Sequence, residues 1–379
     1  MGQGKNKSSL RRKKNVLTTI IATVIVLGIL VFVHELGHFL LAKKLGVKVL
    51  KFSLGFGPRL IGKKIGETEY QIAVFPLGGF VKLLGEDPHE ELKEEDRRRS
   101  LWVQPIWRRL LIFCAGSFFN LFLAIVLFSS VNLFKGVTSI PTIPPKVGEI
   151  SAGLPAEKAG LKQGDLILSI NGKNISKWEE LREIINFSKG KELSLKIDRN
   201  GEIHELRVTP ITVSEETIFG EKIQSFKIGI VPPRVNVEIK RVGPLTAIGY
   251  GFSQTWQTIE FFMIGIIKII QRVIPANQIG SIIMIAKLTG EQAKKGIVDL
   301  ALLTALISIN LGIINLFPIP VLDGGHLLFL GLEAVLRRPV SLRKMEIAQQ
   351  IGLIFLILLM IFAFHNDIIR YFFPGGFKF

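Results

Sequence analysis

The chain has 379 residues, of which 48% are hydrophobic, and a mean hydropathy of +0.40. This composition is too apolar for an ordinary soluble enzyme of that length and indicates a membrane protein. The formal net charge is +17, but the basic residues cluster beside apolar runs without interleaved aromatic residues, which favours a lipid bilayer over nucleic acid as a partner.

Four segments are long and apolar enough to cross a bilayer, which requires about 20 residues. Their approximate bounds are residues 16–42, 109–134, 298–318 and 348–364. The first follows a basic run as a secretory signal would, but its apolar stretch is too long and lacks a small-residue cleavage site. We therefore predict a multi-span α-helical membrane protein with four transmembrane helices.

The first apolar segment contains His34, Glu35 and His38 in the pattern H-E-x-x-H. Residues four apart lie on one face of a helix, so both imidazoles can bind one zinc ion while Glu35 acts as general base on a metal-bound water. A charged group inside a span costs about 2.5–3.5 kcal/mol, so such residues are usually functional. The alternative, polar residues bonded to one another inside a helix bundle, needs only one or two such groups.

A region of different character lies between the second and third spans. Strand-like runs at 146–212 alternate with turn signals such as Asn171-Gly172 and Asn200-Gly201. The stretch SAGLPAEKAGLKQGDLILSINGKNI, with Gly-Leu-x-x-Gly-Asp at 160–165, resembles a PDZ domain of bacterial envelope proteases. PDZ domains bind extended peptides at a sheet edge. We expect an inserted α+β PDZ domain here, and the alternative is a small β-rich spacer.

Catalytic zinc usually takes three protein ligands and leaves a fourth position for water. The third span ends at Pro318 and Pro320, and Asp323 follows at once beside two glycines that allow close backbone approach. Asp323 is the best candidate for the third ligand, and His326 is its rival.

A further apolar stretch at 261–274 is interrupted by Lys268 and Arg272. The histidines lie near the C-terminal end of the first span, and Asp323 lies just after the C-terminal end of the third. These two spans must therefore cross the membrane in the same direction. A full crossing at 261–274 would place Asp323 on the wrong face. We predict an interfacial helix there, with its basic side chains at the membrane surface.

The combination of HELGH in the first span with NLFPIPVLDGG at 315–325 resembles the site-2 protease family of intramembrane zinc metalloproteases, peptidase family M50. The PDZ insertion points to the bacterial regulator of sigma-E protease type, and FPLGGFVKLLGED at 75–87 and AGSFFN at 115–120 agree with it. Ser117 departs from the proline usual in the family, which puts the local helix shape in doubt. The chain also has room for one PDZ domain where well-known relatives carry two.

The resemblance implies that His34, His38 and Asp323 hold Zn²⁺ and that Glu35 activates water. It further implies that Asn315 helps to hold the substrate or the oxyanion.

The loop at 75–84 looks like the membrane-inserted hairpin of the family. Its Gly78 and Gly79, followed by Phe80, would let an edge strand pair with an unwound substrate helix, because a helical peptide bond keeps its carbonyl hydrogen-bonded.

The implied function is cleavage of single-span membrane proteins, such as a trimmed anti-sigma factor or remnant signal peptides, in regulated intramembrane proteolysis. The PDZ domain would act as a size filter or bind substrate tails. A PDZ-bearing membrane adaptor with a structural metal is the alternative, although such a site has no need of Glu35. A transporter is a third hypothesis, but the sequence shows no paired inverted repeat of the kind found in transporters.

Four parts follow from these expectations. They are an N-terminal membrane part with the H-E-x-x-H helix (1–140), the PDZ domain (146–212), a post-PDZ region with the interfacial helix (213–296) and a C-terminal membrane part (297–379).

The expected location is the bacterial inner membrane, and the basic residues bear on the orientation. A basic N-terminal tail favours a cytoplasmic N-terminus, but three flanks on the opposite face outweigh it. These flanks contain Lys43, Lys44, Lys48, Lys51 and Arg59; Arg97, Arg98, Arg99, Arg108 and Arg109; and Arg337, Arg338, Arg343 and Lys344. We therefore expect the metal site near the cytoplasmic side and the PDZ domain on the periplasmic or outer side.

Overall fold

The computed structural model describes residues 3–86, 93–139, 141–217, 220–236 and 238–373. The chain divides into two compact units by its internal contacts. The first unit comprises Met1–Phe134, Gly243–Ile264 and Ala276–Phe379, and the second comprises Lys135–Val242 and Gly265–Pro275.

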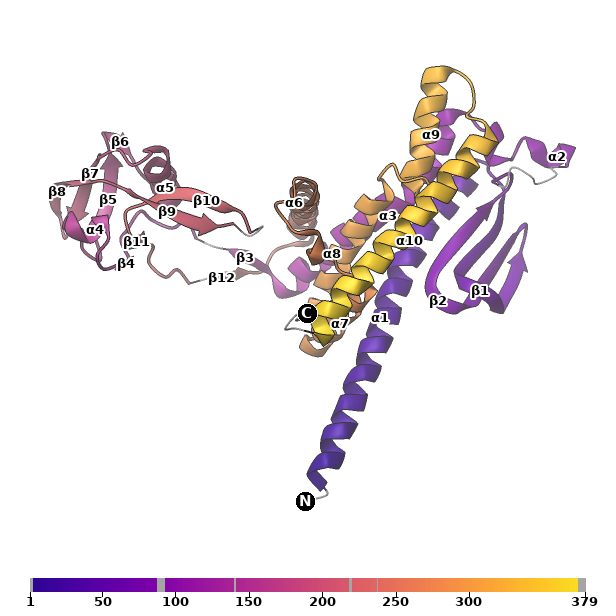
Figure 1. The fold of residues 1–379 in the computed structure, drawn as a ribbon, viewed down its shortest axis with the longest axis horizontal. Helices are drawn as coiled ribbons and strands as arrows, with labels where there is room; N and C mark the ends of the chain where they lie inside the picture. Colours follow the sequence, from indigo (N-terminus) through magenta and orange to yellow (C-terminus); the bar gives the residue numbers. More distant parts are fainter. Residues whose placement is uncertain (1–2, 87–92, 140, 218–219, 237, 374–379) are drawn as a thin grey trace, which may run out of the picture. The chain divides into compact units, whose positions relative to one another are not determined.

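The first unit is mainly helical and also carries one β-sheet (Figure 1). Its elements are α1 (Gln3–Lys44), β1 (Val49–Ile65), β2 (Thr68–Leu83), α2 (Glu94–Arg97), η1 (Leu101–Val103), α3 (Ile106–Lys135), α6 (Pro244–Ile270), η2 (Ala276–Gln278), α7 (Ile282–Lys295), α8 (Ile297–Asn315), α9 (Asp323–Leu336) and α10 (Leu342–Phe372).

Among the described residues, four helices are long and apolar enough to cross a membrane. They are Asn15–Lys44 in α1, Ile106–Lys135 as α3, Ile297–Asn315 as α8 and Arg343–Tyr371 in α10. The prediction of a four-span helical membrane protein is thereby confirmed. The third span ends at Asn315, earlier than expected, because Pro318 and Pro320 follow and the residue before a proline disfavours helical geometry.

The span α1 packs closely against α3 because a glycine faces the neighbouring backbone. A Cβ atom added to Gly37 would lie 2.5 Å from the carbonyl oxygen of Ala115. Helices in membranes use small residues in this way to bring their backbones together. The close approach places the histidines of α1 against the backbone of α3.

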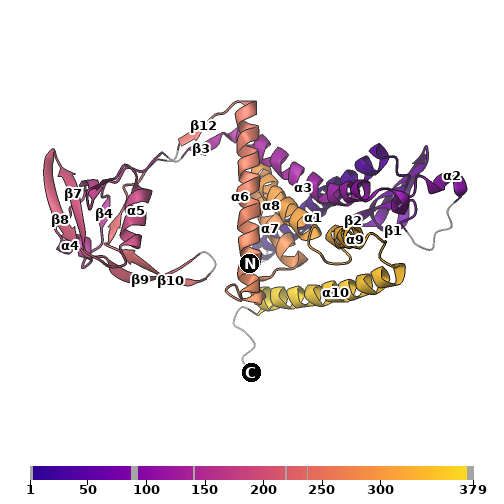
Figure 2. The ribbon, with the colours of Figure 1, turned by 90° about the horizontal axis from the view of Figure 1, so that it is seen from above.

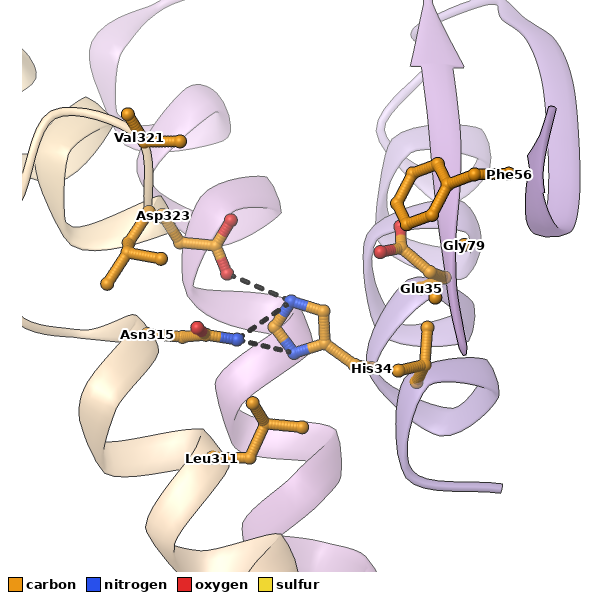
Figure 3. Close-up of a pocket in the computed structure, with 11 residues that line it drawn as sticks. His34, Glu35, Phe56, Gly79, Leu311, Asn315, Val321 and Asp323 are labelled. Atoms are coloured by element: carbon orange, nitrogen blue, oxygen red, sulfur yellow. Dashed lines mark hydrogen bonds and ion pairs between the residues drawn. The ribbon is translucent and has the colours of Figure 1, made fainter. Parts of the chain in front are cut away.

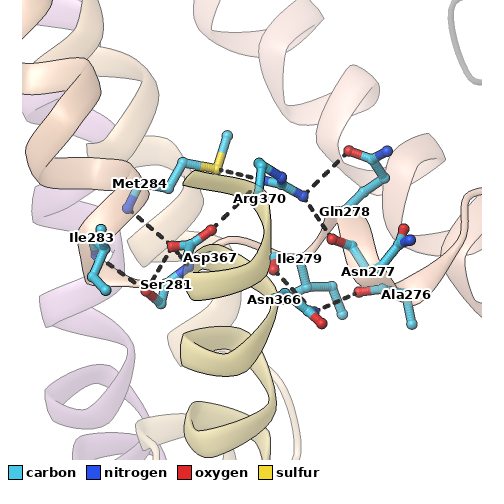
Figure 4. A network of polar contacts seen from close by, with 10 residues as sticks. All are labelled: Ala276, Asn277, Gln278, Ile279, Ser281, Ile283, Met284, Asn366, Asp367 and Arg370. Carbon is cyan, nitrogen blue, oxygen red and sulfur yellow. Dashed lines mark hydrogen bonds and ion pairs between the residues drawn. The ribbon is translucent and has the colours of Figure 1, made fainter. Parts of the chain in front are cut away.

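The C-terminal end of α10 is tied to the start of α7 by polar contacts (Figure 4). Asp367 is fully buried and accepts hydrogen bonds from the backbone N–H groups of Ser281 at 2.8 Å and Met284 at 3.0 Å. It thus caps α7, whose first N–H groups lack partners within the helix. Asn366 and Arg370 donate to carbonyl oxygens of the preceding segment. Most of α10 is otherwise exposed along the edge of this unit (Figure 2).

The strands β1 and β2 form a sheet in which β2 flanks the first part of β1 on both sides. Ser53 of β1 pairs with both Phe80 and Gln71 of β2. The segment around Gly79 is therefore an outer strand of this sheet. The sheet contacts α1 through both strands, which brings the outer strand to the helix that carries the H-E-x-x-H motif.

The apolar stretch at 261–274 belongs to a longer helix than the sequence suggested. The helix α6 runs from Pro244 to Ile270 and ends before Arg272, which has a left-handed conformation with φ of 61°. Residues 271–274 are therefore not helical, and α6 is not among the four helices long and apolar enough to span. Its interfacial position stays a prediction.

The second unit contains mainly strands. Its elements are β3 (Val137–Ser139), β4 (Glu149–Ile150), α4 (Pro155–Lys158), β5 (Leu166–Ile170), β6 (Lys173–Asn174), α5 (Trp178–Phe187), β7 (Leu193–Arg199), β8 (Glu202–Val208), β9 (Ile211–Glu216), β10 (Lys222–Lys227), β11 (Ile230–Val231) and β12 (Glu238–Lys240). The strands β6, β5, β7 and β8 form one antiparallel sheet in that order.

The core of the second unit lies between this sheet and the helices α4 and α5. Ile167, Leu195 and Ile197 of the sheet are fully buried against Ala156 of α4 and Leu181 of α5. This is the inserted α+β domain that the sequence predicted. Its core extends past residue 212, because Ile228 also belongs to it and β11 pairs with β4.

The Gly-Leu-x-x-Gly-Asp signature ends in a buried ion pair. Asp165 is 1% exposed and accepts two hydrogen bonds from the Arg199 guanidinium, at 2.7 and 2.8 Å. Burial alone would raise the pKa of the Asp165 carboxyl, but Arg199 and the backbone N–H of Lys162 hold it below its ordinary value. The acid of the signature therefore has a structural role in joining the α4–β5 turn to β7.

Candidate metal centre

The two histidines of the H-E-x-x-H motif meet on one face of α1. Their Nε2 atoms lie 3.2 Å apart and both side chains are about nine-tenths buried. A separation of four residues places two side chains one above the other on a helix, so the motif needs no irregular backbone to bring its ring nitrogens together.

Asp323 completes a group of three donor atoms. Its Oδ2 lies 3.2 Å from Nε2 of His34 and 3.4 Å from Nε2 of His38. Asp323 is the first residue of α9, directly after the proline-containing turn. A Cβ atom on Gly325, two residues after Asp323, would lie 2.5 Å from the carbonyl oxygen of Ile319, so this glycine lets the turn fold tightly.

The three donor atoms fit a zinc ion by their chemistry and their spacing. With metal–ligand bonds of about 2.0–2.1 Å, neighbouring ligand atoms of a tetrahedral site lie about 3.3–3.4 Å apart. The observed separations are 3.2, 3.2 and 3.4 Å. Asp323 Oδ2 is buried with no hydrogen-bond donor among the described residues, which is the state expected of a ligand atom. Two imidazoles and one carboxylate are a usual set for catalytic zinc.

The helix α3 closes one side of the group. A Cβ atom on Gly116 would lie 2.5 Å from Cε1 of His34, so a larger residue there would collide with the ring. The carbonyl oxygen of Ile112 accepts a hydrogen bond of 2.8 Å from Nδ1 of His38. This bond leaves Nε2 of His38 free for a metal and fixes the direction in which it points.

Glu35 lies on the side of α1 that faces the β-sheet (Figure 3). Glu35 and Val81 of the outer strand both line one cavity. A Cβ atom on Gly79 would lie 3.3 Å from Cγ of Glu35, so the glycine lets the strand approach this side chain closely. Glu35 thus lies between the metal-binding group and the outer strand.

Two cavities meet at these residues. The first, of about 350 Å³, lies between the outer strand and α8, and the second, of about 210 Å³, lies beside α3 and α9. His34, Glu35 and Asp323 line both cavities. A substrate and a water molecule could therefore reach the same three side chains from different sides.

The structure places the other predicted site residues around these cavities. Gly78, Gly79 and Asn315 line the first cavity, and Phe80 lines the second. The side-chain nitrogen of Asn315 lies 3.3 Å from Nε2 of His34. Asn315 is the last residue of α8, so it reaches the metal-binding group from the end of the third span.

The rival ligand His326 lies apart from the three donors. Its ring stacks on Phe113 of α3, with the ring centres 4.5 Å apart and the rings nearly parallel. It lines the second cavity, and its burial lowers the pKa of its imidazole, which favours the neutral form. The donor group found among the described residues contains Asp323 and not His326.

The Asp323 carboxyl is ionised beside the two histidines. Burial alone would raise the pKa of the Asp323 carboxyl, but the adjacent His38 and His34 rings hold it well below its ordinary value. Metal binding needs this ionised carboxylate together with neutral imidazoles, so the two histidines would release any extra proton when a metal ion binds.

Gly116 and Asn120 belong to the stretch AGSFFN, but the sequence did not predict a role at the metal centre for either residue. The Ile112 carbonyl acts through the backbone, so residue type gives no sign of it. The third contact from α3 is made by Asn120, whose side-chain nitrogen lies 3.3 Å from Nδ1 of His34. A signal was available for it, since an asparagine inside an apolar span needs a polar partner.

Comparison with known proteins covers nearly the whole chain. The family model described as peptidase family M50 matches residues 22–359. A Campylobacter jejuni protein assigned by name as a zinc metalloprotease is 37% identical over 350 residues, which cover 92% of this chain and 93% of that protein. The regulator of sigma-W protease RasP of Bacillus subtilis is 30% identical over 432 residues, which cover 94% of this chain and 99% of RasP.

Two solved structures match about a quarter of the chain. They are PDZ domains of SdrC-like proteins from Listeria monocytogenes and Listeria innocua, with 18% and 23% identity. Each match covers 25% of this chain and 92% or 99% of the solved domain, with a TM-score of 0.20.

Proposed function

The chain belongs to peptidase family M50, and from this we propose that it cleaves membrane-spanning proteins at a zinc ion held by His34, His38 and Asp323. The family membership makes the chain a zinc metalloendopeptidase of the site-2 type. The observation that supports this choice of ligands is the triangle of buried donor atoms with sides of 3.2, 3.2 and 3.4 Å. A membrane adaptor with a structural metal would have no use for Glu35 beside that triangle.

The residues divide the work of hydrolysis. Zinc bound there would polarise the scissile carbonyl and lower the pKa of a bound water. Glu35 takes a proton from the attacking water, whose oxygen bonds to the carbonyl carbon. The carbon–nitrogen bond breaks, and Glu35 passes the proton to the leaving nitrogen.

The first cavity is the proposed place of the substrate backbone. Gly78 and Gly79 of the outer strand form one wall and Asn315 stands across from Glu35 (Figure 3). An extended segment beside the outer strand could pair with its backbone, as in other cases of strand addition. Pairing would hold an unwound substrate with its carbonyl groups exposed to attack. Asn315 would donate to the oxyanion from the end of α8.

The proposed substrates are single-span membrane proteins. The name of the Bacillus subtilis relative ties that protein to the regulation of sigma-W. By analogy we propose that this chain cuts a trimmed anti-sigma factor or a remnant signal peptide. Both would offer one apolar helix without a large outer domain, which is what a site between membrane-spanning helices can admit.

The proposed orientation places the metal centre near the cytoplasm and the PDZ-like domain outside, as the basic flanks favour. Single cysteines at Ser176 and Ser341, both exposed, test it in a chain whose Cys114 is replaced by alanine. We expect a membrane-impermeant thiol reagent to label the first position in intact cells and to label the second only after the cells are broken. Labelling of Ser341→Cys alone in intact cells would invert the orientation.

The PDZ-like domain has a groove that could serve either of two roles. A cavity of about 640 Å³ lies beside α5 and is bordered by Leu181, Arg182 and Val231. We propose that the domain acts mainly as a size filter, because strand addition in a single PDZ domain is usually weak whereas exclusion by size needs no affinity. The groove would then contribute little to the cleavage of trimmed substrates.

Two variants separate the filter from a reader of substrate tails. Replacing residues 143–232 by a glycine–serine linker removes the domain with its full core, and Val231→Glu alters the groove alone. If the domain is a filter, we expect the deletion to permit cleavage of untrimmed substrates in proteoliposomes. Val231→Glu should then leave the cleavage rates of both substrate classes unchanged. Slower cleavage of trimmed substrates by Val231→Glu would show a reader instead, and equal rates for both substrate classes in all variants would exclude both roles.

A further inference from the structure

Asn120 of α3 has a carboxamide oxygen without a partner next to one of the ligand histidines. The residue is fully buried, and no hydrogen-bond donor among the described residues reaches its Oδ1. Its Nδ2 lies 3.3 Å from Nδ1 of His34. A buried amide oxygen without a donor destabilises the fold, so the position calls for an explanation.

The protonation of His34 supplies the explanation. If Nε2 of a neutral imidazole binds a metal, the proton is on Nδ1, which then needs an acceptor. Asn120 can provide one, because rotating its carboxamide by half a turn exchanges nitrogen and oxygen in nearly the same space. The oxygen then lies where the nitrogen is now, within hydrogen-bond reach of the Nδ1 proton, and the amide oxygen gains its donor.

Asn315 is the other amide near His34, but its geometry does not suit this role. Its Nδ2 lies 3.5 Å from Nδ1 and 3.3 Å from Nε2. An atom almost equally distant from both ring nitrogens does not lie along the N–H bond of either. Asn120 is close to Nδ1 alone, so it is the better acceptor.

The backbone of Asn120 is fixed independently of its side chain. Its carbonyl oxygen accepts a hydrogen bond of 2.7 Å from the Ser308 hydroxyl of α8, and Ser308 is fully buried. Gly312, one turn further along α8, also lies against α3, since a Cβ atom there would be 3.1 Å from the Ser117 carbonyl oxygen. Helix packing therefore fixes the backbone that carries the carboxamide, whichever way the amide is turned.

We propose that Asn120 is a positioning residue that accepts the Nδ1 proton of His34 and so directs Nε2 of this ring to the metal. The helix α3 would then orient both ligand histidines, through the Ile112 carbonyl for His38 and the Asn120 carboxamide for His34. This inference rests on the proposed function, because it presumes that Nε2 of His34 is a ligand.

The test is the zinc affinity of the purified full-length chain, measured in detergent by competition with a chelator of known affinity. Loss of the partner of a metal-ligating histidine typically weakens metal binding by about 10- to 100-fold. We expect Asn120→Ala to weaken zinc binding by that factor. Asn120→Asp keeps an acceptor oxygen and should bind zinc at least as tightly as the wild-type chain.

Asn132→Ala is the matched control. Asn132 is also a buried asparagine of α3, but it donates to Gln254 of α6, away from the metal centre. Both alanine variants remove one buried amide from the same helix, so their metal-free chains should lose similar thermal stability. Only Asn120→Ala should lose zinc affinity, and Asn120→Asp should recover the affinity.

Three results would overturn the inference. Zinc affinities of Asn120→Ala and Asn132→Ala within twofold of the wild type would show that Asn120 does not position His34. Failure of Asn120→Asp to bind better than Asn120→Ala would show that the oxygen acceptor is irrelevant. A wild-type chain that binds no zinc would instead overturn the proposed function, and this inference with it.

Discussion

Glu35→Gln is expected to abolish cleavage of a single-span substrate while leaving the zinc content of the purified chain unchanged. The substitution keeps the size of the side chain and all three proposed ligands, but an amide cannot take a proton from water. Loss of a general base lowers rates by about 10²- to 10⁴-fold. Cleavage in proteoliposomes and metal analysis of the same preparation measure the two quantities together.

Glu260→Gln provides the control for the same chemical change elsewhere in the membrane part. Glu260 lies on α6 and accepts a hydrogen bond from Trp256, away from the metal centre. We expect this variant to cleave at the wild-type rate. Substantial cleavage by Glu35→Gln would rule out the proposed general base, and loss of its zinc would show that Glu35 acts on the metal site itself.

Asp323→Ala is expected to lose zinc and activity together, whereas His326→Ala should keep most of both. Loss of a residue that only supports a metal ligand weakens metal binding by up to about 100-fold. Removal of one of the three ligands themselves should weaken zinc binding by more than that. His326 stacks on Phe113 and lies outside the donor group, so its loss removes packing but no ligand.

Equilibrium dialysis of both purified variants against buffered zinc measures this difference. The reverse order of affinities would make His326 the third ligand. Equal loss in both variants would point to a folding defect, which the thermal unfolding of the metal-free chains would reveal.

The membrane architecture could be predicted because its signals are local in the sequence. Each of the four spans is a continuous apolar run, and the end of the third follows from Pro318 and Pro320. His34, Glu35 and His38 also form a local pattern, since helix periodicity alone places the two histidines together. Asp323 could be proposed because it directly follows the helix-ending prolines.

Other features depend on contacts between distant segments, which local patterns do not encode. The second unit includes β11 because Ile230 pairs with Ile150, far back in the chain. The strand β2 flanks the first part of β1 on both sides, although the sequence indicated only an edge strand near Gly79. Polar contacts around Asp367 join α10 to α7, and nothing near this residue in sequence points to Ser281.

The contribution of α3 to the metal centre shows the same limit. The Ile112 carbonyl orients His38 through a backbone atom that every residue type has. Gly116 matters because of what its missing side chain would touch. Only Asn120 carries a chemical signal, and the sequence does not show which face of the span it occupies.

A zinc ion held by His34, His38 and Asp323 is proposed to hydrolyse the peptide bonds of membrane-spanning substrates. The most direct test is cleavage of a single-span peptide by the reconstituted wild-type chain, before chelation, after removal of zinc and after zinc is added back in an equal amount. We expect cleavage to fall to the level of Glu35→Gln on chelation and to return with zinc. Cleavage that persists in the zinc-free chain would contradict the proposal.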